Sequence, residues 1–142
     1  MSAQSPKWLL WAGIAFILWN LMGVGSFVNE WTIGPEALAK LPQAQQDMIG
    51  NMPGWLWAAF AFGVFGGLLG SIAVLLKKAW AAPVYLVSLI AVVLQFGYIY
   101  ATAGKTIMAE GFAMAAFPAL VIAIAAVQWG LARKWRSAGW LA

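Results

Sequence analysis

Residues 55–76 read WLWAAFAFGVFGGLLGSIAVLL, a run of 22 residues that contains no charged side chain. At a rise of 1.5 Å per residue, a helix of this length is about 33 Å long, enough to cross a hydrocarbon core of roughly 30 Å. Pro53 and Gly54 precede the run, and Lys77 and Lys78 follow it. The stretch therefore predicts a membrane-spanning helix.

Three more uncharged stretches of similar length lie at residues 8–28, 80–101 and 112–131. The whole chain is 64% hydrophobic and 8% charged, whereas soluble domains carry about 25% charged residues. The sequence therefore predicts an all-α fold, an integral membrane four-helix bundle, in one transmembrane domain that covers residues 1–142. Its direct surroundings would be a lipid bilayer.

The first stretch, residues 8–28, has some features of a secretory signal peptide. It is longer than the usual apolar region of roughly 7–15 residues in such peptides, Asn20 interrupts it, and only Lys7 precedes it as a basic residue. We therefore expect it to be the first membrane span.

Charges are distributed unevenly between the two sides of the predicted bundle. Six basic residues adjoin one side: Lys7, Lys77, Lys78, Arg133, Lys134 and Arg136. The other side has two basic residues and all four acids: Lys40, Lys105, Glu30, Glu36, Asp47 and Glu110. Because cytoplasmic loops carry the excess of Lys and Arg, we expect both termini to lie in the cytoplasm, with the chain in a bacterial inner membrane.

The segment between the first two spans is the longest polar stretch. Pro35 and Glu36 suit the first turn of a short helix, and Pro42 would end it. We expect an amphipathic or ordered outer loop, either a linker or an interfacial flap over the outer mouth of the bundle.

Small residues recur at four-residue spacing in the second span. The set comprises Ala59, Gly63, Gly67 and Ser71, with Gly66 and Gly70 beside them. Residues four apart share a helix face, so another backbone can approach this face closely. The pattern predicts tight helix packing, either within the chain or between two chains. The alternative is that the glycines leave room for a ligand or a sliding helix.

Polar residues form a stripe on the third span, where Ser88, Gln95 and Thr102 recur every seven residues. Asn20 of the first span lies roughly 18 Å from the cytoplasmic boundary and Gln95 roughly 22 Å, so the two amides could meet. With Trp19 and Tyr98, they predict an uncharged pocket that binds a neutral, hydroxyl-bearing ligand. The alternative is a hydrogen bond between helices, worth about 0.6–2 kcal/mol.

Missing residue types exclude several kinds of chemistry. The chain has no His and no Cys, so we expect no metal site, no cofactor and no thiol nucleophile. The basic residues lie at helix ends rather than on a nucleic-acid-binding face. No Asp, Glu, Lys or Arg lies within the four apolar stretches, which disfavours ion-coupled transport.

Several motifs resemble a group of small uncharacterised proteobacterial membrane proteins with four spans. The resemblance rests on Leu18, Trp19, Asn20 and Gly23, on Pro53, Gly54 and Trp55 followed by the glycines of the second span, and on Lys77, Lys78, Ala79, Trp80, Ala81, Pro83, Ser88 and Leu89. Members are sometimes labelled "sugar transporter". In small sugar transporters of the triple-helix-bundle kind a Pro-Gln pair lies within a helix, whereas Pro42 and Gln43 here lie in the predicted loop.

Three functional hypotheses follow. The first is a non-enzymatic membrane protein that binds or passes a neutral sugar- or polyol-like solute without ion coupling. We expect it to be an oligomer, because four helices enclose little volume. The second is an accessory or assembly subunit of a larger membrane complex, held through the small residues of the second span. The third is a membrane enzyme that acts on a lipid or a quinone.

Overall fold

A computed structural model describes residues 5–142 and, apart from residues 44, 103, 106, 107, 110 and 112–115, their side chains. This part of the chain folds into helices joined by short connections and has no strand: α1 (Trp8–Trp31), α2 (Pro35–Ala39), α3 (Gln43–Gly50), α4 (Gly54–Leu75), α5 (Ala81–Glu110) and α6 (Phe112–Ser137). The helices α1, α4, α5 and α6 are each long and apolar enough to span a membrane. The prediction of an all-helical chain with four such helices is confirmed.

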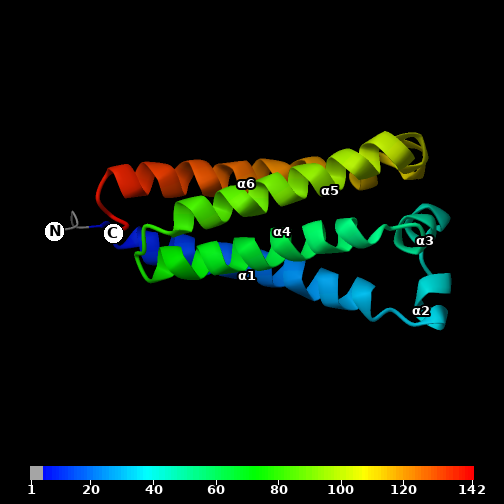
Figure 1. Ribbon diagram of the computed structural model, residues 1–142, viewed down its shortest axis with the longest axis horizontal. Helices are drawn as coiled ribbons and strands as arrows, with labels where there is room; N and C mark the ends of the chain where they lie inside the picture. Colours follow the sequence, from blue (N-terminus) through cyan, green and yellow to red (C-terminus); the bar gives the residue numbers. More distant parts are fainter. Residues whose placement is uncertain (1–4) are drawn as a thin grey trace.

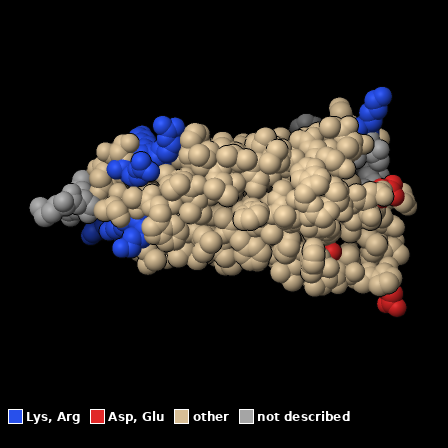
Figure 2. Space-filling model, in the orientation of Figure 1, with Lys and Arg blue, Asp and Glu red and all other residues tan. Residues whose placement is uncertain are grey.

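The long helices follow one another as neighbours in space. α1 packs against α4, α4 against α5, and α5 against α6 (Figure 1). Both termini lie at one end of the bundle, and α2 and α3 lie at the other. Most of the visible Lys and Arg atoms lie at the end with the termini, whereas the visible Asp and Glu lie toward the opposite end, where some Lys or Arg atoms are also seen (Figure 2). The cytoplasmic location of the basic end stays a prediction.

Two tight connections define the hairpins. After α4, Lys77 adopts a left-handed conformation with φ of 57°, the N–H of Lys78 donates to the carbonyl of Ala73 at 2.8 Å, and the N–H of Lys77 donates to Val74 at 3.0 Å. This pair of bonds is a Schellman motif, which ends the helix abruptly. Between α5 and α6 the connection is Gly111 alone, with φ of 131°, a conformation that side-chain-bearing residues rarely adopt.

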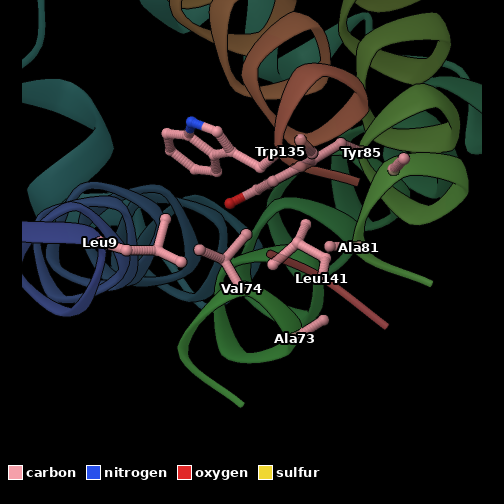
Figure 3. Close-up of a cluster of buried hydrophobic side chains, with 9 residues drawn as sticks. Leu9, Ala73, Val74, Ala81, Tyr85, Trp135 and Leu141 are labelled. Atoms are coloured by element: carbon pink, nitrogen blue, oxygen red, sulfur yellow. The ribbon is translucent and has the colours of Figure 1, made fainter. Parts of the chain in front are cut away.

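The end of the bundle near the termini is solidly packed. Nine buried residues from α1, α4, α5, α6 and the C-terminal segment form one cluster there: Leu9, Ala73, Val74, Ala81, Ala82, Tyr85, Ala132, Trp135 and Leu141 (Figure 3). The Trp135 ring also stacks on Phe16 at a centroid distance of 6.2 Å and meets Trp8 edge-on at 5.9 Å. The aromatic side chains of α1 and α6 therefore close this end.

The small residues of α4 face neighbouring helices of the same chain. A Cβ added at Gly63 would lie 2.9 Å from Val92, and one at Gly70 would lie 2.7 Å from the Tyr85 ring, both on α5. A Cβ at Gly67 would collide with the Asn20 side chain of α1. Of the rest of the set, Ala59 and Ser71 are buried, and Gly66 lies against Ser88.

Candidate functional site

A cavity of about 870 Å³ occupies the half of the bundle away from the termini. Its walls come from all four long helices, and residues of α3 and its flanks line its outer part. The helices of a single chain therefore form the cavity walls, although we expected four helices to enclose little volume. Most of the wall is apolar, with Phe60 and Val64 from α4, Phe96 from α5 and Val121 from α6.

Two glutamine side chains line the cavity and lack protein partners. Gln95 of α5 is 4% exposed and Gln128 of α6 is 2% exposed. The Nε2 of Gln128 has no hydrogen-bond acceptor among the described residues, and none of the hydrogen bonds found there involves the Gln95 side chain. A buried N–H without a partner costs about 1–3 kcal/mol, so the Gln128 amide requires a polar atom within the cavity. The Gln95 amide can form a second hydrogen bond to such an atom.

Asn20 also lines the cavity, but its amide is used within the bundle. Its Nδ2 donates to the carbonyl of Phe16 at 2.7 Å and to the Ser71 hydroxyl at 3.0 Å. The amide thus joins α1 to α4, and no hydrogen bond joins it to Gln95. Counting residues along each helix gave the two amides similar depths, but the bonding partner lies on a third helix.

Trp19 and Tyr98 line the same cavity and are partly exposed. The Tyr98 ring meets Trp55 of α4 edge-on at a centroid distance of 5.2 Å. All four residues predicted for the ligand site, Trp19, Asn20, Gln95 and Tyr98, thus reach one cavity, together with Pro118 of α6. Their role in binding a ligand stays a prediction.

The mouth of the cavity is polar and acidic. Glu30, the next-to-last residue of α1, and Asp47 of α3 line it together with Gln45 and Asn51. The structure leaves Glu30 partly exposed at this mouth. The Glu110 side chain, the other acid expected near the outer mouth, lies outside the described residues.

Gln128 is the residue of this site that the sequence analysis missed. It is the one polar side chain besides Trp129 in the run 112–131, and a polar residue in such a run indicates a side chain that faces the interior of the bundle. Its neighbour Trp129 and the basic residues that follow are typical of a membrane interface, so the sequence alone does not place Gln128 inside the bundle. α6 continues to Ser137, however, and this places Gln128 roughly 13 Å from the helix end, inside the bundle.

No protein-family model, curated protein or solved structure matches this chain. The chemistry of the site must therefore be read from its own residues. Among the residues that the structure describes, no three His, Cys, Asp or Glu side chains form a group that would hold a metal ion. Two amides, each with donor and acceptor atoms, in a mainly apolar chamber can bind an uncharged molecule that carries hydrogen-bonding oxygen atoms.

Proposed function

We propose that this protein binds a neutral, hydroxyl-bearing solute of the sugar or polyol kind in the cavity between its four long helices, without coupling to an ion. Its place would be the bacterial inner membrane, with both termini in the cytoplasm. The observation that carries the proposal is the buried Nε2 of Gln128, which has no hydrogen-bond partner among the described residues and lines the cavity together with the buried amide of Gln95.

A hydroxyl group complements these amides in both directions. It donates one proton and accepts through its oxygen, while an amide offers two N–H donors and one carbonyl acceptor. A polyol that bridges Gln95 and Gln128 would satisfy groups that otherwise remain unpaired. A charged ligand would have no matching charge near these amides, because the acids that line the cavity, Glu30 and Asp47, lie at its mouth.

Binding is better supported than open passage. The packed cluster around Trp135 and Tyr85 closes the end of the bundle with the termini and separates the cavity from that side. Passage across the membrane would require a second state in which this end opens. Coupling such a change to an ion usually involves an ionisable group within the membrane. The cavity lining away from the mouth has amide, hydroxyl and apolar side chains, and no Asp, Glu, Lys or Arg is among these described residues.

Equilibrium binding to protein in lipid nanodiscs tests the proposal, with radiolabelled glucose and glycerol as probes. The double variant Gln95→Leu, Gln128→Leu should lose at least about tenfold in affinity, since each lost hydrogen bond costs about 1 kcal/mol. Gln43→Leu is the matched control, because Gln43 is exposed on α3 and does not line the cavity. Equal binding by the double variant and the unmodified protein would refute the site.

A stoichiometric membrane partner in the purified sample would favour the subunit hypothesis instead.

A further inference from the structure

The cavity reaches the surface of the bundle between α1 and α6, at the level of the membrane. Met22 of α1 and Phe117 of α6 both line the cavity, yet they are 68% and 56% exposed. Each lies within a candidate membrane span, Trp8–Trp31 or Ala116–Ser137. A side chain can face both the cavity and the surroundings only at the rim of an opening, and this rim is apolar.

The arrangement of the helices accounts for this opening. The four long helices are neighbours in the order α1, α4, α5 and α6, because α1 packs mainly on α4 and α6 mainly on α5. The first and last helices of this order, α1 and α6, therefore have few contacts with each other. Aromatic contacts of Trp135 with Trp8 and Phe16 join them near the termini, and the two helices lie farther apart at the other end (Figure 1). A gap at this position faces hydrocarbon if the four helices span a membrane.

The size and the lining of the cavity indicate a ligand larger than a free polyol. A volume of about 870 Å³ lies near the upper end of the roughly 300–1,000 Å³ usual for small-molecule sites. The unpartnered amide of Gln128 lies roughly 16 Å along α6 from Phe117, and apolar side chains such as Val121 line the space between. The two glutamine amides thus lie at the inner end of the cavity, and the apolar rim lies at the lateral opening.

From this polarity we infer that the ligand is a neutral amphiphile, a hydroxylated head group on a hydrocarbon chain, which reaches the cavity sideways from the bilayer between Met22 and Phe117. The head group binds Gln95 and Gln128, and the chain extends along the apolar wall toward the lipid. This inference rests on the proposed function and assigns the chemical class of the ligand. The opening within the span would let such a molecule enter without leaving the membrane.

Octyl glucoside and glucose, compared in the same binding assay, test the inference. With protein in phosphatidylcholine nanodiscs and protein-free nanodiscs subtracted, octyl glucoside below its micelle concentration should bind at least about tenfold more tightly than glucose, because each buried methylene adds affinity. Octyl sulfate, with the same chain and an anionic head, should bind more weakly than octyl glucoside. Equal affinities for glucose and octyl glucoside would overturn the inference, and so would tight binding of octyl sulfate.

Larger side chains at the rim test the route. Met22→Trp and Phe117→Trp should each weaken octyl glucoside binding several-fold. Leu21→Trp and Leu120→Trp are the matched controls on the same two helices, because Leu21 and Leu120 are 47% and 50% exposed and do not line the cavity. Unchanged binding in both rim variants would refute the lateral route. A change of oligomeric state in the rim variants alone would assign the gap to a second copy of the chain and overturn the inference.

The two proposals fail in different ways. If neither glucose nor octyl glucoside binds, or if both bind equally well to the Gln95→Leu, Gln128→Leu variant, the proposed function is wrong. If binding depends on the two glutamines but not on the octyl chain or on the rim, the proposed function holds and the amphiphile inference alone is wrong.

Discussion

The phenol oxygen of Tyr85 lies 2.7 Å from the hydroxyl oxygen of Ser71, and this hydrogen bond joins α5 to α4 inside the bundle. The Ser71 hydroxyl gives its single proton to the carbonyl of Gly67 at 2.7 Å. Tyr85 must therefore be the donor to Ser71, whose second lone pair accepts from Asn20 at 3.0 Å. One hydroxyl thus links three helices, directly beside the cavity.

Loss of this hydroxyl should loosen all three helices. Ser71→Ala removes the acceptor of both Tyr85 and Asn20, and hydrogen bonds between membrane helices are worth about 0.6–2 kcal/mol each. We expect the free energy of unfolding, measured by SDS titration in mixed micelles, to fall by about 1–2 kcal/mol. Thr102→Ala is the control, because the exposed Thr102 hydroxyl bonds only to the carbonyl of Tyr98 in its own helix. Equal effects of the two substitutions would contradict the proposed link.

Gly67 provides the space that the Asn20 side chain occupies. A methyl group at Gly67 collides with the Asn20 amide, and overpacking of this kind costs about 1–3 kcal/mol. Gly67→Ala should therefore lower the free energy of unfolding by that amount. Gly25→Ala, where nothing lies within 4 Å of the added carbon, should leave it nearly unchanged. Combining Gly67→Ala with Asn20→Ala should restore part of the loss, and no recovery would show that the collision is not the cause.

Gln128→Leu should have the opposite effect on stability. The Nε2 of Gln128 is buried and has no acceptor among the residues that the structure describes, so replacement by an apolar side chain of similar size removes an unpaired polar group. We expect the free energy of unfolding without ligand to rise by about 1 kcal/mol, while affinity for the neutral probes falls. A residue that stabilises when it is made apolar but weakens binding is one retained for function. A clear loss of stability instead would mean that the amide has a structural partner.

The sequence predicted the four long helices because the length and the absence of charge in each stretch suffice to identify them. The ends of the helices instead depend on which residues continue or stop a helix. α5 continues nine residues beyond the expected end at residue 101, since residues 102–110 contain no proline and their one glycine, Gly104, does not end the helix, which stops only before Gly111. The site was partly predictable for a similar reason. The structure brings all four predicted residues to one cavity: Trp19, Asn20, Gln95 and Tyr98. Which amide finds a partner depends on how each helix is rotated about its axis. Counting residues along a helix gives the depth of a side chain but not this rotation.

Trp135 holds the closed end of the bundle, where it is 2% exposed and contacts Trp8 and Phe16. Trp135→Ala should lower the free energy of unfolding by about 3–5 kcal/mol, as large-to-small substitutions of buried aromatic residues do. Trp11→Ala is the control, since Trp11 is 68% exposed and should change stability little. In proteoliposomes, the Trp135 variant should also pass glycerol faster, because the removed ring is part of the barrier between the cavity and this end. Unchanged glycerol flux in a folded variant would place the barrier elsewhere.

The orientation of the bundle is testable because the chain has no cysteine of its own. A single Cys at Lys78 or at Ser137 lies at the basic end, and one at Gln43 or at Asn51 lies at the opposite end, all at exposed positions. Since the basic end should face the cytoplasm, a membrane-impermeant maleimide added to spheroplasts should label the second pair and spare the first until the cells are lysed. The reverse pattern would invert the topology, and the acidic mouth of the cavity, with Glu30 and Asp47, would then open toward the cytoplasm.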